Sequence, residues 1–250
     1  VTATGTNNID LSAAAKAGVR VCNVIQYGRP SIVQHTFSLL LALANRLPDY
    51  ITDVQDGRWN RSPIFCLMDH PIVELEGKTI GIVGYGDLGQ GVAKMAEAFG
   101  MNVLLAGRSG QALGYEDGYQ RLALDELLPR VDVLSLHCLL SDETENLIDA
   151  KALACMKSSA FLLNLARGGI VDEPALAEAL KNGQLAGAAT DVLSSEPPRE
   201  GNVLLDREIP NLIVTPHCAW ASREARQRLL DKTVTNIRDF RAERLSRFVV

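Results

Sequence analysis

The sequence predicts an α/β protein whose main domain is a doubly wound parallel sheet. Two observations lead to this fold class. From about residue 78 onward, short apolar runs alternate with stretches of helical pattern, which is the signature of βαβ units. A glycine-rich turn at 84–89 also follows one apolar run directly and opens the next helical stretch. The length of 250 residues allows one large domain or two smaller ones.

Composition places the chain among ordinary globular proteins, with 47% hydrophobic and 22% charged residues. A net charge of −5 argues against a nucleic-acid partner or an anionic membrane surface, since both attract basic proteins. No apolar run approaches the ~20 residues of a membrane span, and no signal-peptide pattern opens the chain. The five cysteines are scattered and form no CxxC pair, as in proteins with reduced thiols. We therefore expect a cytoplasmic protein without a membrane partner.

The first seventy residues differ from this alternating pattern. We expect a short extended stub at 1–4, a helix near 12–17, a strand at 19–24, an apolar helix at 32–47 and an extended arm at 53–71. At the other end of the chain, apolar and charged residues recur at helical spacing over 223–241. This pattern predicts a long amphipathic helix.

Six short apolar runs predict the strands of the sheet, at 79–83, 103–105, 131–136, 160–164, 186–192 and 212–214. Helices are predicted between some of them, at 90–99, 150–156 and 173–181. Gly100 ends the first of these helices, and the last has Asp172 as its N-cap and Pro174 in its first turn. Right-handed crossovers between parallel strands then produce the doubly wound arrangement.

The turn between the first strand of the sheet and its helix has the GxGxxG pattern of a dinucleotide-binding, Rossmann-type fold. Gly84 permits the tight turn, Gly86 lets the backbone approach a pyrophosphate, and Gly89 allows close packing of helix on strand. The pyrophosphate is expected at the positive end of the helix. The candidate cofactor-binding residues here are Gly84, Tyr85, Gly86, Asp87, Leu88 and Gly89.

The residues after the second strand bear on the choice of cofactor. NAD-selective folds usually place an acid there to hold the ribose 2′-hydroxyl, whereas this chain has Gly107, Arg108 and Ser109. Arg108 and the Ser109 hydroxyl could bind a 2′-phosphate, so NADP(H) is favoured and NAD(H) remains possible. The alternative is that Arg108 is an ordinary exposed loop residue.

Three polar residues follow three different strands, and ligands of open α/β sheets bind at the carboxyl ends of the strands. These are Arg167, Glu196 and His217. Arg167 could clamp a substrate carboxylate, and His217 could donate a proton to the carbonyl oxygen of a 2-oxo acid. Glu196 would stabilise the imidazolium. Each residue taken alone has an ordinary structural alternative. Arg167 could form a surface ion pair, Glu196 could be a solvated loop acid, and His217 could be a hydrogen-bonded histidine at the sheet edge.

The other histidines carry less information. His35 lies in the apolar helix, where it is packed or interfacial, and His70 lies in the arm. His137 ends the strand at 131–136 on the same edge, so it could line the cofactor site. The histidines and acids show no metal-ligand spacing, so we expect no metal.

Five motifs carry a family resemblance: ATGTNNID at 3–10, ELEGKT at 74–79, NLARGG at 164–169, DVLSSEP at 191–197 and TPH at 215–217. With these motifs in order, the chain resembles the D-isomer-specific 2-hydroxyacid dehydrogenases, and most closely their glycerate dehydrogenase and hydroxypyruvate reductase branch. The resemblance implies that Arg167, Glu196 and His217 are catalytic. It also implies that Asp191 faces the nicotinamide amide and that Trp220 borders the substrate.

The same resemblance implies a second, flavodoxin-like substrate domain, of which this chain holds only part. Residues 1–28 and 223–250 would belong to that domain, and 29–222 to the dinucleotide-binding domain. The resemblance further implies a homodimer whose interface uses the arm at 53–71. Family members often have an acid at the position of Gly107, and this departure favours NADP(H).

These expectations combine into one activity. We expect a dehydrogenase that interconverts D-glycerate and hydroxypyruvate with NADP(H) or NAD(H) and also reduces glyoxylate. The alternative is a nucleotide-sensing binding protein, since the resemblance extends to transcriptional corepressors on the same scaffold.

Overall fold

The computed structural model describes residues 1–6, 8–108, 113–244 and 248–250, and the chain divides into two compact units. The first unit combines Val1–Ile32 with Cys218–Val250, and the second comprises Val33–His217. The two terminal segments of the first unit are each a few residues longer than the 1–28 and 223–250 expected from sequence.

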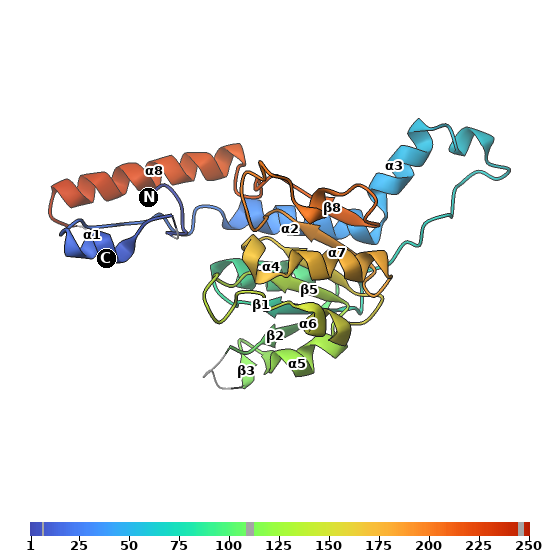
Figure 1. Ribbon diagram of the computed structural model, residues 1–250, viewed down its shortest axis with the longest axis horizontal. Helices are drawn as coiled ribbons and strands as arrows, with labels where there is room; N and C mark the ends of the chain where they lie inside the picture. Colours follow the sequence, from blue (N-terminus) through green and yellow to red (C-terminus); the bar gives the residue numbers. More distant parts are fainter. Residues whose placement is uncertain (7, 109–112, 245–247) are drawn as a thin grey trace. The chain divides into compact units, whose positions relative to one another are not determined.

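The second unit is built on one eight-stranded sheet of order β3-β4-β2-β1-β5-β6-β7-β8 (Figure 1). All neighbouring strands run parallel except β3 and β4, which form an antiparallel pair. This arrangement confirms the predicted doubly wound α/β fold. The strands are β1 Thr79–Val83, β2 Asn102–Ala106, β3 Gly114–Glu116, β4 Tyr119–Leu122, β5 Val133–Leu136, β6 Phe161–Asn164, β7 Gly187–Thr190 and β8 Leu212–Val214.

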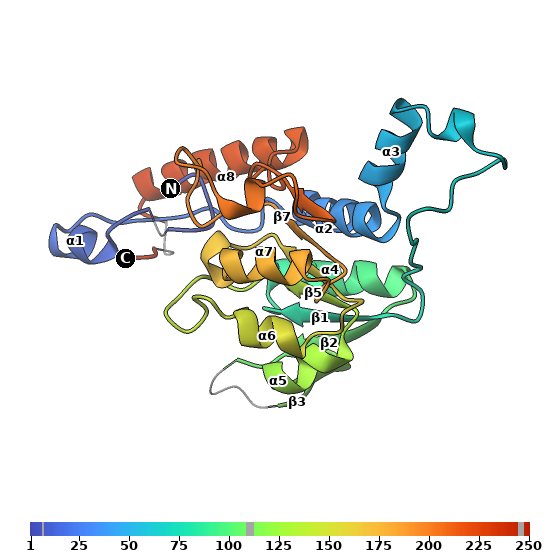
Figure 2. The same cartoon turned by 45° about the vertical axis from the view of Figure 1, so that its right-hand side comes forward.

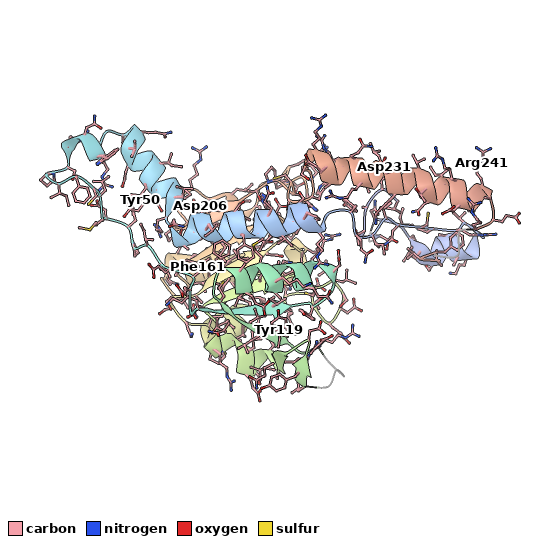
Figure 3. The ribbon with its side chains drawn as sticks, turned by 180° about the vertical axis from the view of Figure 1, so that it is seen from behind. Tyr50, Tyr119, Phe161, Asp206, Asp231 and Arg241 are labelled. Atoms are coloured by element: carbon pink, nitrogen blue, oxygen red, sulfur yellow. The ribbon has the colours of Figure 1, made fainter. Side chains whose placement is uncertain are left out.

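Helices cover both faces of this sheet. In Figure 2, α5, α6 and α7 lie over one face, and the view from behind in Figure 3 shows α2 and α4 over the other. Phe37 of α2 stacks on Phe99, which directly follows α4, with ring centroids 5.2 Å apart. The helices of the chain are α1 Leu11–Lys16, α2 Arg29–Ala44, α3 Leu47–Gln55, α4 Asp87–Ala98, α5 Leu124–Leu127, α6 Ala150–Cys155, α7 Glu173–Lys181 and α8 Arg223–Arg241.

Three parts of this unit were absent from the sequence prediction: the β3–β4 hairpin, the short helix α5 and the helix α3. The β3–β4 hairpin has a polar sequence with an exposed first strand, so a search for apolar runs passes over it. The predicted helix 32–47 is wrong at its C-terminal end, because α2 stops at Ala44 and Arg46 adopts φ +50°. A separate helix, α3, starts at Leu47 with Pro48 in its first turn. The predicted arm therefore begins inside α3.

The first unit holds α8 against an extended segment, and the predicted strand at 19–24 is wrong. Three α8 side chains one helical turn apart (Arg228, Lys232 and Asn236) donate hydrogen bonds to the carbonyl oxygens of Tyr27, Ile25 and Asn23, respectively. Because helix side chains satisfy these alternate carbonyl groups, the segment makes only scattered backbone pairs, such as Val24 N to Ala3 O. None of the described helices is long and apolar enough to cross a membrane.

Candidate active site

The glycine-rich turn joins β1 to α4, and sterics explain two of its three glycines. Gly84 has φ +95°, and a Cβ there would overlap the backbone of His137 and Cys138. A Cβ on Gly89 would overlap the carbonyl oxygen of Gly84. Both positions therefore require glycine for folding alone.

Gly86 differs, because nothing lies within 4 Å of where its Cβ would be. It caps α4, whose first turn contains Asp87 and Leu88, and the first N–H groups of an α-helix have no acceptor within the helix itself. Open space in front of a helix N-terminus is what a pyrophosphate requires. The turn thus fits a dinucleotide cofactor, with room at Gly86 for the phosphates.

Tyr85 packs against the β3–β4 hairpin. Its hydroxyl donates to Asp117 at 3.2 Å, and its ring meets Tyr119 edge-on with centroids 5.8 Å apart. Burial, reinforced by the Asp117 carboxylate, raises the pKa of Tyr85 to about 12. Tyr85 therefore connects the turn to the hairpin, and Figure 3 labels Tyr119 at that end of the sheet.

The residues that follow β2 present a cation and no acid. Arg108 is exposed. The N–H of Gly107 donates to Leu122 O at 2.7 Å, and a Cβ at 107 would press on the Leu113 side chain. An acidic residue at 107 would thus require Leu113 to move. Ser109, the other residue expected here, lies outside the described residues.

Three adjacent strands, β6, β7 and β8, end level with one another at the carboxyl edge. Asn164, Thr190 and Val214 are register partners in this part of the sheet. Arg167 follows β6 by three residues, and His217 follows β8 by three. Glu196 lies in the loop after β7, which ends at Thr190, two residues before the predicted end of that strand.

Glu196 and His217 form a direct pair. His217 Nδ1 lies 2.6 Å from Glu196 Oε2, and Glu196 Oε1 accepts the backbone N–H of Leu193 at 2.8 Å. With Nδ1–H donated to the carboxylate, Nε2 is left for a substrate. The pair therefore has the geometry of an imidazole acid/base oriented by a carboxylate.

Arg167 lies on the turn after β6. Its guanidinium Nη1 donates to Ala166 O at 2.7 Å, and the Asn164 side chain donates to Arg167 O at 2.8 Å. The next residue, Gly168, packs so closely that a Cβ would overlap the peptide between Leu193 and Ser194. The arginine turn and the glutamate loop are thus in backbone contact.

Asp191 is 2% exposed and lies in a polar network that sequence reasoning missed. Thr215 Oγ1 donates to Asp191 Oδ1 at 2.5 Å, and His35 Nε2 lies 3.1 Å from the same hydroxyl and 3.6 Å from the carboxylate oxygen. The sequence suggested only that His35 is packed or interfacial. The position of His35 within α2 gives no indication that it contacts Asp191, which lies 156 positions further along the chain.

His137 follows β5 and turns toward the sheet interior. Its Nε2 lies 2.8 Å from the hydroxyl of fully buried Ser135. Burial lowers the pKa of His137 to about 4, so the ring is neutral at physiological pH. Its Nδ1 is buried without a hydrogen-bond partner among the described residues. His137 also borders Gly84 through its backbone.

Trp220 belongs to the other unit. There its ring meets Tyr27 edge-on, with centroids 6.4 Å apart, beside the cluster of Val24, Ala225 and Leu229.

Comparison with known proteins identifies similar chains. Residues 37–219 match the family model described as "D-isomer specific 2-hydroxyacid dehydrogenase, NAD binding domain". A glycerate dehydrogenase from Methylorubrum extorquens is 46% identical over 96% of this chain and 74% of its own length.

Two solved structures have the same fold. D-lactate dehydrogenase from Aquifex aeolicus, solved with NAD and lactic acid, has a TM-score of 0.87 and 30% identity over all of this chain and 78% of that one. An NADPH-dependent glyoxylate/hydroxypyruvate reductase from Sinorhizobium meliloti, solved with NADP and malonate, has a TM-score of 0.82 and 30% identity, over 96% of this chain and 72% of that one. The similar structures therefore include both nicotinamide cofactors.

Proposed function

Since this chain belongs to the D-isomer-specific 2-hydroxyacid dehydrogenases, we propose that it interconverts D-glycerate and hydroxypyruvate and also reduces glyoxylate. It is an oxidoreductase that uses a nicotinamide cofactor. The observation that carries the proposal is the pairing of His217 Nδ1 with Glu196 at 2.6 Å, on the same strand edge as Arg167.

In the proposed reaction each of these three residues has a separate task. Arg167 binds the carboxylate of the 2-oxo acid and orients its carbonyl group. His217 donates a proton from Nε2 to the carbonyl oxygen and takes it back in the oxidative direction. Glu196 stabilises the charged imidazole and fixes its ring orientation through Nδ1. The proton lost by His217 is replaced from solvent, because the His217 side chain is 39% exposed.

The turn at 84–89 would hold the pyrophosphate of the cofactor against the N-terminus of α4, with Gly86 at the closest approach. When bound, the nicotinamide supplies or accepts the hydride at the substrate carbon. We assign Asp191 to the nicotinamide amide group, and Trp220 to the border of the substrate. The backbone of His137 lies beside Gly84, which supports a place for that residue along the cofactor site.

We favour NADP(H) over NAD(H). The exposed cation Arg108 at the end of β2 could bind a 2′-phosphate, and position 107 carries no acid to repel it. The NADPH-dependent relative described above supports this choice, and the relative solved with NAD keeps NAD(H) as the second candidate.

We also propose a homodimer formed through the arm at 53–71, and a cytoplasmic location. Large apolar side chains of the arm, including Trp59, Ile64, Phe65 and Met68, are exposed. A row of such residues is typical of a protein–protein interface.

The test is the decay of reduced-nicotinamide absorbance, with NADPH and NADH each paired with hydroxypyruvate, glyoxylate and pyruvate. We expect turnover with hydroxypyruvate first, glyoxylate second, and NADPH preferred by about tenfold or more, the worth of one charged contact. Arg108→Ala should remove this preference and leave NADH turnover unchanged. Preference for NADH in the wild type would refute the role of Arg108 but leave the proposed dehydrogenase activity intact.

The relatives reported above are dehydrogenases and reductases, which favours the enzyme over the corepressor-like sensor. Binding of cofactor without turnover on any 2-oxo acid would refute the proposed reaction.

A further inference from the structure

A buried carboxylate outside the proposed catalytic trio holds the loop that carries Glu196. Glu173, the first residue of α7, is 7% exposed. Its Oε1 accepts the backbone N–H of Ser194 at 2.6 Å, and its Oε2 accepts the Ser194 hydroxyl and the Asn202 side-chain amide, each at 2.6 Å. Three short hydrogen bonds to one carboxylate form a strong, directional attachment.

Capping of α7 does not explain these contacts. Asp172 is the N-cap of the helix and accepts the N–H of Ala175 at 3.0 Å. Glu173 instead turns its carboxylate toward the loop, and it joins two residues, Ser194 and Asn202, that lie on either side of Glu196 in sequence.

The attachment continues directly into the Glu196–His217 pair. Glu173 binds the N–H of Ser194, while Glu196 binds the N–H of the preceding residue, Leu193. Gly168, next to Arg167, packs on the peptide between these two residues. Any displacement of that peptide would therefore move Glu196 relative to His217 and would disturb the arginine turn.

We propose that Glu173 is a positioning residue that fixes the Glu196 loop and thereby sets the carboxylate of Glu196 against the imidazole of His217. This inference rests on the proposed function for its catalytic readout. A group held within about 0.5 Å of its working geometry needs such support, and outer partners of catalytic side chains supply it.

The first test is Glu173→Gln. The glutamine amide has almost the same shape as the carboxylate. If its Oε1 still accepts the N–H of Ser194, its NH₂ group faces the NH₂ group of Asn202. Two donors then oppose each other, and this hydrogen bond is lost. We expect kcat to fall about 10- to 100-fold, the usual effect of removing an outer partner, while cofactor Kd stays within about twofold. The pH dependence of kcat in Glu173→Gln should be displaced from that of the wild type in the same direction as in Glu196→Gln.

The control is Glu178→Gln, the same substitution at an exposed position of the same helix, which should change none of these quantities. Rescue is tested with Glu173→Gln/Asn202→Asp. Here the new amide donates to the new carboxylate, whose second oxygen can still accept the N–H of Leu204, as Asn202 Oδ1 does at 2.9 Å. We expect the double variant to regain most of the lost kcat.

A structural role alone predicts a different result. In that case Glu173→Gln lowers the melting temperature but leaves kcat and its pH profile unchanged below that temperature, and the proposal is refuted. If Glu173→Gln does not fold, Ser194→Ala removes one of the three hydrogen bonds and must still lower kcat in the same direction.

A readout without turnover separates this inference from the proposed function. The Nδ1–H proton of His217 is followed by NMR in the wild type and in Glu173→Gln. Loss of the short hydrogen bond to Glu196 should move this resonance upfield or broaden it beyond detection. An inactive wild type in which Glu173→Gln still changes this resonance refutes the reaction and supports the positioning role. An unchanged resonance refutes the positioning role.

Discussion

The catalytic candidate His217 has a backbone conformation that most residues avoid. His217 has φ +50°, a region that histidine and asparagine enter more readily than most other residues. Its N–H donates to Asp191 O at 2.8 Å and to Thr215 O at 3.0 Å, so the turn after β8 is tied to the end of β7. In this backbone geometry Nδ1 faces Glu196 at 2.6 Å, and the proposed reaction uses Nε2 for the reacting oxygen.

We predict that His217→Asn lowers kcat by about 10²- to 10⁴-fold, the usual worth of a general acid. Asparagine is chosen because it tolerates positive φ, so the fold should be retained and cofactor affinity unchanged. The measurement is the steady-state rate with hydroxypyruvate and NADPH, with melting temperature as the control. Full turnover in this variant would show that another group supplies the proton.

His137 predicts a dependence of stability on pH. The unfolded chain protonates this histidine near its ordinary pKa of about 6.5, whereas burial lowers the pKa of the folded form to about 4. The folded state therefore binds fewer protons between these values, and the free energy of unfolding falls as the pH drops through them. The loss is about 2 kcal/mol from pH 7 to pH 5.

Urea unfolding at pH 7 and pH 5 measures this loss in the wild type and in His137→Gln. Glutamine can still bond to Ser135 but does not titrate, so the pH-dependent loss should shrink by about 2 kcal/mol. The comparison cancels the carboxyl groups that titrate in both proteins. Equal losses in the two proteins would mean that His137 is protonated alike in the folded and unfolded states.

At the scale of elements, the β1–α4 turn contains two kinds of glycine. Two are required for the fold, and one leaves space next to the N-terminus of α4. Gly84 and Gly89 lie against backbone atoms, and Gly86 lies next to open space. The N-terminal end of α4 begins beside that space. One short element thus combines a steric requirement of the fold with the proposed cofactor-binding function.

This difference predicts opposite effects for two alanine substitutions. Gly86→Ala should keep the melting temperature within about 2 °C, while it weakens cofactor binding at least about tenfold by filling the space for the pyrophosphate. Gly89→Ala should lower the free energy of unfolding by about 1–3 kcal/mol, because its Cβ overlaps Gly84 O. Fluorescence titration with NADPH and urea unfolding measure the two effects. Tight cofactor binding by Gly86→Ala would place the phosphates elsewhere.

At the scale of the whole molecule, the arm that begins with α3 extends away from the sheet of its own unit (Figures 1 and 2). Asp53 holds its base, because the buried carboxylate accepts from Arg58 at 2.6 Å and pairs with His70 Nε2 at 2.9 Å. Burial opposes ionisation, but these two partners outweigh it and lower the pKa of Asp53. The arm therefore has an ordered base and exposed apolar side chains, with Phe65 89% exposed.

For the proposed homodimer, we predict that Phe65→Ser raises the dissociation constant by about 30-fold or more, as expected for an aromatic residue at the centre of an interface. The exposed side chain makes little contribution to its own protomer, so the melting temperature of the dissociated protein should stay unchanged. Sedimentation velocity over a range of concentrations measures the dissociation constant. Tyr115→Ser, at a residue 77% exposed in β3, is the matched control. An unchanged dissociation constant would exclude the arm as the interface.

Local sequence patterns account for the parts of the fold that could be predicted. Alternation of apolar runs predicted the parallel sheet, and the spacing of Gly84, Gly86 and Gly89 predicted the turn between β1 and α4. The prediction failed where no local pattern exists: in the polar β3–β4 hairpin, at the positive φ of Arg46, and in the extended segment held by α8 side chains.

The sequence by itself thus determined the fold class, the glycine turn and the strands after which Arg167, Glu196 and His217 occur, because each depends on residues close together in the chain. Only the tertiary structure decided which side chains meet. The contacts of Glu196 with His217 and of Glu173 with Ser194 each join residues 21 positions apart. Such contacts depend on strand order and loop path, which arise from packing of the whole unit and not from any local run of residues.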